Sequence, residues 1–199
     1  YTITIQDGEA PGITCPDDIV QDSDPGVCSA MVTPPIPPCT DNCSCEVVCK
    51  LPDETPIEPG TAYEFPVGET VITCTATDGV NEVSCQYTIT IEDNELPVIT
   101  GCPDGQTIQK NNDPGECSAL VLLPVITASD NCGIGEFGCE LPDGTPVVPG
   151  TSYEFPVGNT EVCCTAEDVN GSAATCCFNV KVRDTEKPSM TEPVPNPVI

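Results

Sequence analysis

The chain has 199 residues, with 32 acidic side chains against five basic ones, no histidine and a formal net charge of −27. This charge repels nucleic acids and anionic membrane surfaces, so neither is expected as a partner. The sequence has no glycine-rich phosphate loop and no nucleophile motif, which predicts that it is not an enzyme. No apolar run is long enough to cross a bilayer, and no leader is recognisable, so we expect a mature segment without membrane insertion.

Sixteen cysteines and 23 prolines stand beside an aromatic content of only 4%. Small cores of this kind are usually stabilised by disulfides, which persist in oxidising compartments. The chain is therefore expected to be extracellular, either secreted or on a cell surface. Short runs rich in Val, Ile and Thr alternate with Pro and Gly, and no window has helical periodicity, which predicts an all-β fold.

The chain opens on Tyr1-Thr-Ile-Thr-Ile5, whose alternation of apolar and polar residues predicts a half-buried strand. The same five residues return at 87–91, and a divergent copy stands at 178–182. An acidic junction and a proline follow each copy. Residues 1–7 are therefore predicted to be the last strand of a preceding or neighbouring repeat.

The first complete repeat begins with a predicted strand that ends at Cys15. A hairpin closes the repeat around the turn Asp78-Gly-Val-Asn81. Short strands separated by turn residues are typical of an antiparallel sandwich. Between its ends the repeat is expected to hold a loop over 16–26, strands over 28–32 and 45–50, and hairpin strands over 70–77 and 83–92.

A second copy of the repeat follows the first. Residues 51–68 return as 141–158 with 14 of 18 positions identical. We predict one domain over 8–93 and a second over 94–184. Gly101, inserted before the first cysteine of the second copy, suggests a bulge. Residues 185–199 are expected to be a linker or the start of a following repeat, with Glu192 in place of its first cysteine.

Several landmarks together carry a resemblance to a known family. They are Ile13-Thr-Cys-Pro16, Asp24-Pro-Gly26 with Cys28, Asp41-Asn-Cys43, Phe65-Pro-Val-Gly68 and Cys74-Thr-Ala-Thr-Asp78, each with a counterpart in the second copy. This set resembles the hyalin-repeat (HYR) family over residues 7–184. The resemblance implies two tandem immunoglobulin-like antiparallel β-sandwiches, disulfide-rich and extracellular, usually arranged in arrays, associated with adhesion and matrix, and without catalytic activity.

Two cysteines are unique to each copy and are expected to pair as Cys39–Cys45 and Cys163–Cys177; the latter two face each other around a turn centred near Asn170. In an immunoglobulin-like sandwich the first strand lies near the last, and the third beside the penultimate one. This arrangement implies Cys15–Cys85, Cys49–Cys74 and, by elimination, Cys28–Cys43, with Cys102–Cys176, Cys139–Cys164 and Cys117–Cys132 in the second copy. A competing scheme joins Cys74 to Cys85. The close cysteine spacings also fit a soft-metal cluster, although the lack of histidine argues against it.

Two kinds of surface site follow from the sequence. The junction acids offer carboxylate oxygens to a calcium ion that would stiffen the joint, or else merely keep the linker solvated. They are Asp7, Glu9, Glu92, Asp93, Glu95, Asp184 and Glu186. Asn170-Gly-Ser172 and Asn42-Cys-Ser44 match the N-glycosylation pattern, so attached glycans are expected at Asn170 and Asn42. No other cofactor is expected.

The leading functional hypothesis is an extracellular structural segment or protomer of a filament, stalk or matrix fibre. Its repeats would be joined either in one long chain or by self-association, with the strand at 1–5 added to a neighbouring sheet. The alternative is a cell-surface adhesion module that recognises a protein or glycan partner. Few aromatic residues are available to stack on sugar rings, which counts against glycan recognition.

Overall fold

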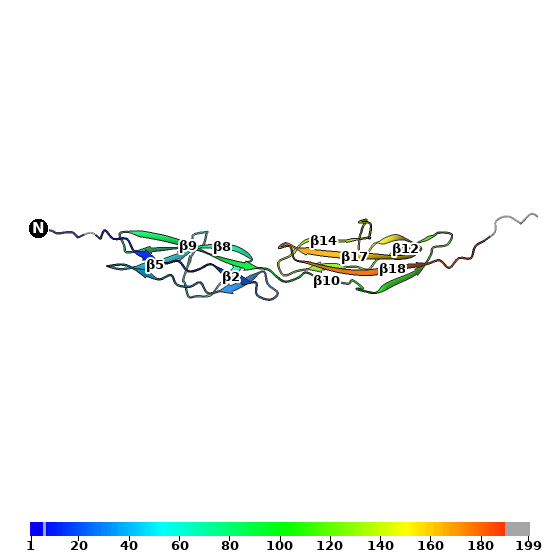
Figure 1. The fold of residues 1–199 in the computed structure, drawn as a ribbon, viewed down its shortest axis with the longest axis horizontal. Helices are drawn as coiled ribbons and strands as arrows, with labels where there is room; N and C mark the ends of the chain where they lie inside the picture. Colours follow the sequence, from blue (N-terminus) through cyan, green and yellow to red (C-terminus); the bar gives the residue numbers. More distant parts are fainter. Residues whose placement is uncertain (6, 190–199) are drawn as a thin grey trace, which may run out of the picture. The chain divides into compact units, whose positions relative to one another are not determined.

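The computed structural model describes residues 1–5 and 7–189. The chain divides into two compact units, Tyr1–Glu95 and Leu96–Ile199, here called domain 1 and domain 2. Each domain is an immunoglobulin-like β-sandwich, and Figure 1 labels several of its strands. Among the described residues, no helix is long and apolar enough to cross a membrane.

Domain 1 is built around a five-stranded sheet in the order β2-β9-β8-β5-β6. Two smaller pairs, β3 with β7 and β1 with β4, complete it. The bounds are β1 Gly12–Ile13, β2 Ile19–Asp22, β3 Ser29–Val32, β4 Cys39–Thr40, β5 Glu46–Lys50, β6 Pro56–Ile57, β7 Tyr63–Pro66, β8 Gly68–Thr77 and β9 Glu82–Glu92.

Domain 2 repeats this arrangement with the sheet β11-β18-β17-β14-β15 and the pairs β12-β16 and β10-β13. The bounds are β10 Val98–Thr100, β11 Thr107–Asn111, β12 Ser118–Leu122, β13 Thr127–Ser129, β14 Ile134–Glu140, β15 Pro146–Val147, β16 Ser152–Pro156, β17 Gly158–Asp168 and β18 Ala173–Arg183.

The cores lie on the inner faces of these sheets and follow the period of two. In β9 the side chains of Tyr87, Ile89 and Ile91 are buried and packed against Phe65, while the residues between them face outward. Domain 2 places Phe155 and Phe178 in the same kind of cluster. Successive strand residues point to opposite faces, so one face of each strand supplies the core.

The start of each repeat differs from the sequence prediction. The loop expected over 16–26 contains β2, which pairs in parallel with β9, with Ile19 opposite Ile89. The short strand β1 pairs instead with β4. The first strand therefore divides between two sheets, and each domain has one parallel pair in an otherwise antiparallel pattern. Pro16 separates the two halves because it cannot donate to a ladder.

The segment Tyr1–Ile5 is not a strand in the structure of this chain, and its predicted role as the last strand of a preceding or neighbouring repeat stays a prediction. Ile3 and Ile5 are 85% and 90% exposed. The same sequence at 87–91 is a strand because β2 and β8 flank it. The alternating pattern is therefore correct for a strand, but no ladder partner pairs with residues 1–5 within the described part of the chain.

Gly101 does not form a bulge inside a strand, contrary to the prediction. It lies directly after β10 with a φ of +79°, a left-handed conformation. A Cβ atom at this position would collide with the backbone carbonyl of Val125. Only glycine satisfies both conditions, which explains the inserted residue. The expected linker or repeat start at 185–199 is described only as far as residue 189, where it has no strand.

Candidate functional site: the acidic ends and the cysteines

Three aspartates meet at one end of domain 1, beside the β8–β9 turn. Asp78 Oδ1 accepts hydrogen bonds from the backbone N–H groups of Val80 and Asn81, both at 2.6 Å. Asp41 Oδ2 accepts from the N–H of Cys43 at 2.8 Å. Oxygens of Asp7 and Asp41 and the sulfur of Cys43 lie within 4.8 Å of one another. We call this the acidic end, defined by Asp7, Asp41 and Asp78.

Domain 2 has an acidic end of the same design, defined by Asp130 and Asp168. Asp168 Oδ1 accepts hydrogen bonds from the N–H groups of Asn170 at 2.7 Å and Ser172 at 2.9 Å, which closes the β17–β18 turn. Asp130 Oδ1 accepts from the N–H of Cys132 at 2.9 Å.

The electrostatics of the acidic end follow from these contacts. Hydrogen bonds from the backbone and side chain of Asn81, and from the N–H of Val80, hold the pKa of Asp78 below its ordinary value. A hydrogen bond to Asp7 and its negative charge raise the pKa of the Cys43 thiol, and Asp41 and Asp78 add to this effect. These contacts therefore favour the ionised carboxylate of Asp78 and the protonated thiol of Cys43.

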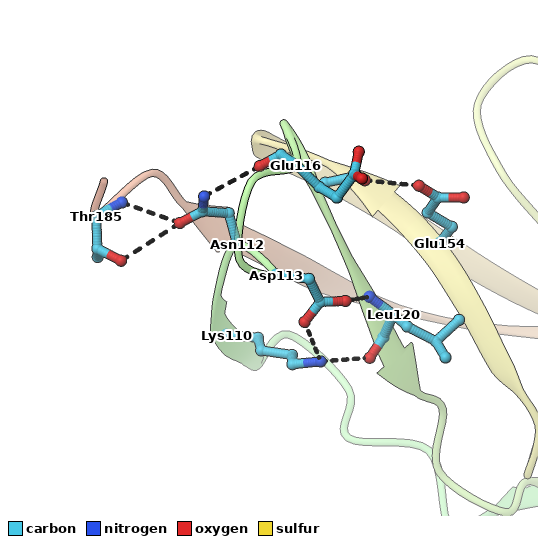
Figure 2. A network of polar contacts seen from close by, with 8 residues as sticks. Lys110, Asn112, Asp113, Glu116, Leu120, Glu154 and Thr185 are labelled. Atoms are coloured by element: carbon cyan, nitrogen blue, oxygen red, sulfur yellow. Dashed lines mark hydrogen bonds and ion pairs between the residues drawn. The ribbon is translucent and has the colours of Figure 1, made fainter. Parts of the chain in front are cut away.

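The opposite end of each domain is defined by the repeated Asp-Pro-Gly turn, at 24–26 and 113–115, and is called the DPG end. Figure 2 shows its polar network in domain 2. Asp113 Oδ2 accepts from the N–H of Leu120 at 2.8 Å, and Lys110 Nζ lies 3.1 Å from Asp113 Oδ1. Asn112 Oδ1 accepts from the N–H of Thr185 at 3.0 Å. This network fixes the loop that leads to Cys117.

The junction acids proposed as calcium ligands do not form one cluster. Asp7 belongs to the acidic end of domain 1, and Asp93 is buried. Glu95 and Glu186 instead accept a hydrogen bond from the N–H of Gly26 and of Gly115 respectively, each at 2.8 Å, at the DPG ends. The remaining three, Glu9, Glu92 and Asp184, are exposed.

Sequence reasoning missed Asp41, Asp78, Asp130 and Asp168 as members of these groups. The signal was present, because the Asp-Asn-Cys and Cys-Thr-Ala motifs carry an aspartate at the same place in both copies. What the sequence does not show is that the two motifs fold against each other at one end of the sandwich.

Six of the disulfides each join two cysteines of the same domain. The pairs are Cys15–Cys85, Cys39–Cys45, Cys49–Cys74, Cys102–Cys176, Cys139–Cys164 and Cys163–Cys177. Cys74 faces both Cys49 on β5 and Cys85 on β9, and it bonds to Cys49. Cys49–Cys74, Cys139–Cys164 and Cys163–Cys177 each join facing residues on neighbouring strands of one sheet.

The predicted pairs Cys28–Cys43 and Cys117–Cys132 are wrong, because Cys43 and Cys117 carry free, exposed thiols. The carbonyl of Cys28 accepts from the N–H of Val67, directly before β8 begins. Ser44, next to Cys43, donates to the carbonyl of Asp78, directly after β8 ends. A ten-residue strand separates the two positions by about 30 Å, far beyond disulfide reach.

The same geometry separates the equivalent cysteines in domain 2. The carbonyl of Cys117 accepts from the N–H of Val157, directly before β17 begins. The carbonyl of Gly133, next to Cys132, accepts from the N–H of Val169, directly after β17 ends. Cys117 therefore lies at the DPG end, and Cys132 at the acidic end. Cys28 and Cys132 are both disulfide-bonded.

Both expected glycosylation sites are exposed. Asn170 lies on the β17–β18 turn, and Asn42 lies in the Asp41 turn. Their side chains are accessible to a glycosylating enzyme, and glycosylation remains a prediction.

Replacing Asp7 with Asn should speed alkylation of Cys43 at pH 8. Because the pKa of Cys43 is raised, the parent chain holds less thiolate at pH 8 than an ordinary cysteine would. Its alkylation rate should therefore rise only at a pH above the ordinary pKa of a thiol. Removing the Asp7 charge lowers the pKa and restores thiolate. The rate is measured by peptide mass spectrometry with iodoacetamide between pH 7 and 10. Asp53→Asn, at a remote turn, is the control; equal rates in all three proteins would contradict the assignment.

The fold and these cysteines define a pair of disulfide-rich immunoglobulin-like domains. The HYR domain model matches residues 6–91 and 92–182. The chain belongs to the HYR domain family.

Curated relatives are much longer than this chain. A Rattus norvegicus protein named "Sushi, von Willebrand factor type A, EGF and pentraxin domain-containing protein 1" is 34% identical over 187 residues, which are 92% of this chain and 5% of that protein. Hyalin of Strongylocentrotus purpuratus is 33% identical over 135 residues, 65% of this chain and 10% of hyalin. The titin domains z1z2, solved with telethonin, align with a TM-score of 0.43 and 13% identity over 91% of this chain and 100% of that chain.

Proposed function

We propose that the chain is a segment of an extracellular structural protein, in which HYR domains are joined in series into a filament, stalk or matrix fibre. The observation that carries this proposal is the pair of identical segments at 1–5 and 87–91. Ile89 and Ile91 are 0% and 1% exposed in domain 1, whereas Ile3 and Ile5 are almost fully exposed. A segment with the sequence of a core strand gains stability by completing the sheet of another repeat.

The two free thiols support the same proposal. Cys43 lies at the acidic end of domain 1, and Cys117 lies at the DPG end of domain 2. Their equivalents in the other copy, Cys132 and Cys28, are disulfide-bonded. In an oxidising compartment an exposed thiol without a partner is a liability. Neighbouring repeats that supply the missing partners would make the array covalent.

Substituting Asn for Ile3 and Ile5 should abolish self-association of the chain. Each isoleucine loses about 1.5–3 kcal/mol of burial in the completed sheet, so association weakens by 100-fold or more. Negative-stain microscopy and sedimentation velocity measure the outcome. Val80→Asn, an exposed residue of the β8–β9 turn, is the matched control. Fibres that persist in the double variant, or a parent chain that stays monodisperse, would refute strand donation.

A second candidate function is a cell-surface adhesion module, which one observation favours. The outer face of the domain 1 sheet carries a hollow of about 670 Å³ lined by Val48, Val71, Thr75 and Gln86 among others. The equivalent face of domain 2 carries a hollow of about 420 Å³. This function would be favoured over the structural one if the chain is monodisperse and binds a defined glycan or peptide, and if the Thr75→Trp variant no longer binds that ligand.

A further inference from the structure

Basic residues are concentrated near the DPG end of domain 2. Four of the five in the chain lie there, and they are Lys110, Lys181, Arg183 and Lys187. Lys110 pairs with Asp113 in the network of Figure 2. Lys181 and Arg183 are exposed on the outer face of β18, because the residues directly before them point into the core. Neither forms an ion pair with any residue in 1–5 or 7–189, so two cations of a strongly acidic chain have no carboxylate partner.

Uncharged polar side chains stand beside these two cations on the outer face of the sheet. Lys181 is opposite Asn159 on β17, and Arg183 is opposite Asn111 on β11. Both asparagines are exposed. We call this surface the basic patch, defined by Asn111, Asn159, Lys181 and Arg183. Glu161, opposite Asn179, borders it on β17.

Domain 1 has the opposite charge at the same four positions of its sheet. They are occupied by Asp22 on β2, Glu69 on β8, and Thr90 and Glu92 on β9. Glu69 is opposite Thr90, and Asp22 is opposite Glu92, so the register is that of domain 2. The three carboxylates are exposed. We call this surface the acidic patch, and it presents three anions where the basic patch presents two cations.

No basic residue of domain 1 neutralises the acidic patch. Lys50 is the one basic residue of that domain, and it pairs with Glu54 at 2.9 Å. Lys50 lies on β5, which is separated from β9 by β8. The carboxylates of the acidic patch therefore lack a cation within their own domain, as the cations of the basic patch lack a carboxylate.

We propose that the basic patch of one chain binds the acidic patch of a second chain, so that neighbouring chains associate side by side. Both patches lie on the outer face of the equivalent sheet, with the same register and a strand spacing of about 4.8 Å. Opposite charges at matching positions make the two surfaces complementary. This lateral contact goes beyond the proposed function, because it needs neither the strand at 1–5 nor a free thiol.

The net charge of the chain sets the conditions for this contact. Two chains of charge −27 repel each other at long range. At about 0.15 M salt this repulsion is screened beyond about 8 Å, whereas ion pairs that are partly buried in a contact are screened less. An exposed ion pair contributes little by itself, so a single contact is weak. Repetition of the domains along a fibre would strengthen the lateral association through multivalency.

The first measurement is the self-association of a full chain that carries Ile3→Asn, Ile5→Asn and alkylated thiols. Strand donation and disulfide formation cannot contribute in this background, so a failure of the proposed function does not affect the result. We expect the amide resonances of Lys181 and Glu69 to shift with protein concentration at about 0.15 M salt. The shifts should vanish at about 1 M salt, where the Debye length is about 3 Å.

The second measurement reverses the charge of each patch in this background. Lys181→Glu with Arg183→Glu leaves one chain with acidic patches alone, and Glu69→Lys with Glu92→Lys leaves another with basic patches alone. Each chain by itself should show shifts roughly tenfold smaller, because attraction becomes repulsion. A mixture of the two should associate again, since each supplies the patch that the other lacks. The amide of Asp22 in the isotope-labelled first chain reports on this mixture.

Glu46→Lys with Glu82→Lys is the matched control. It makes the same change in net charge at the acidic end of the same sheet, on either side of Thr77, and should leave self-association intact. Circular dichroism checks that each variant is folded. The proposal is overturned if the spectra of the background chain do not depend on concentration, if the two reversed chains do not associate when mixed, or if the control loses association as the Glu69 and Glu92 variant does.

Discussion

Replacing Cys49 and Cys74 together with alanine should lower the free energy of unfolding of domain 1 by about 3–4 kcal/mol. Their disulfide spans 25 residues, and loop closure of that length is worth roughly 3.5 kcal/mol in the chain-entropy model. Both residues are fully buried, so packing of the two sulfurs is lost as well. The melting temperature should fall by about 10–20 °C, as measured by calorimetry.

Cys39→Ala with Cys45→Ala is the matched control for this prediction. That disulfide spans only six residues and lies between half-buried side chains. Loop closure there is worth about 2 kcal/mol, so the melting temperature should fall less. Equal effects of the two double substitutions, or a negligible effect of the first, would show that the core disulfide does not support the sandwich.

Replacing Phe155 with alanine should cost domain 2 about 3–5 kcal/mol, enough to unfold much of it. The ring is fully buried and meets Tyr153 edge to face, with centroids 5.2 Å apart. Phe155 packs in the same core cluster as Phe178, so its removal leaves a cavity in the centre of the domain. Denaturant unfolding followed by circular dichroism gives the loss.

The control for Phe155 is Leu122→Ala at the end of β12, the strand that pairs with β16. Leu122 is 66% exposed, so its replacement with alanine should lower the free energy of unfolding by less than about 0.5 kcal/mol. A loss below 1 kcal/mol at Phe155 would mean that the disulfides alone hold domain 2 together.

The hairpins are the part of the fold that the sequence predicts best. Period-two alternation over 83–92 identifies the buried face of β9, and a turn centred near Asn170 places Cys163 opposite Cys177, the register that β17 and β18 adopt. These inferences are local, because turn length and side-chain period determine the register. Because the two copies share the same pattern, a strand predicted in one domain is also predicted in the other.

Long-range pairing is where the sequence is insufficient. The pairing of Cys28 with Cys43 by elimination assumes that every cysteine finds its partner inside its own copy. The ten residues of β8 keep them at opposite ends. The acidic ends are not predictable from the sequence for a related reason. Asp130 and Asp168 are 38 positions apart, and they come together only because β14 pairs with β17.

The division of the first strand into β1 and β2 is also not predictable from the sequence. Residues 16–26 contain Pro16, Pro25 and four aspartates, a composition typical of a loop. Ile19 nevertheless packs against the core, and β2 adds to β9 in parallel. A four-residue edge strand is too short for its pattern to stand out from the turn residues around it.

Disulfide mapping of the full chain, assembled under oxidising conditions, tests the proposed array most directly. Strand donation and thiol pairing together predict covalent multiples of the 20.8 kDa chain that disperse on reduction, with a cross-linked peptide that contains Cys43 and Cys117. A chain that stays at 20.8 kDa without reductant, with both thiols still open to alkylation, would contradict a covalent series of domains.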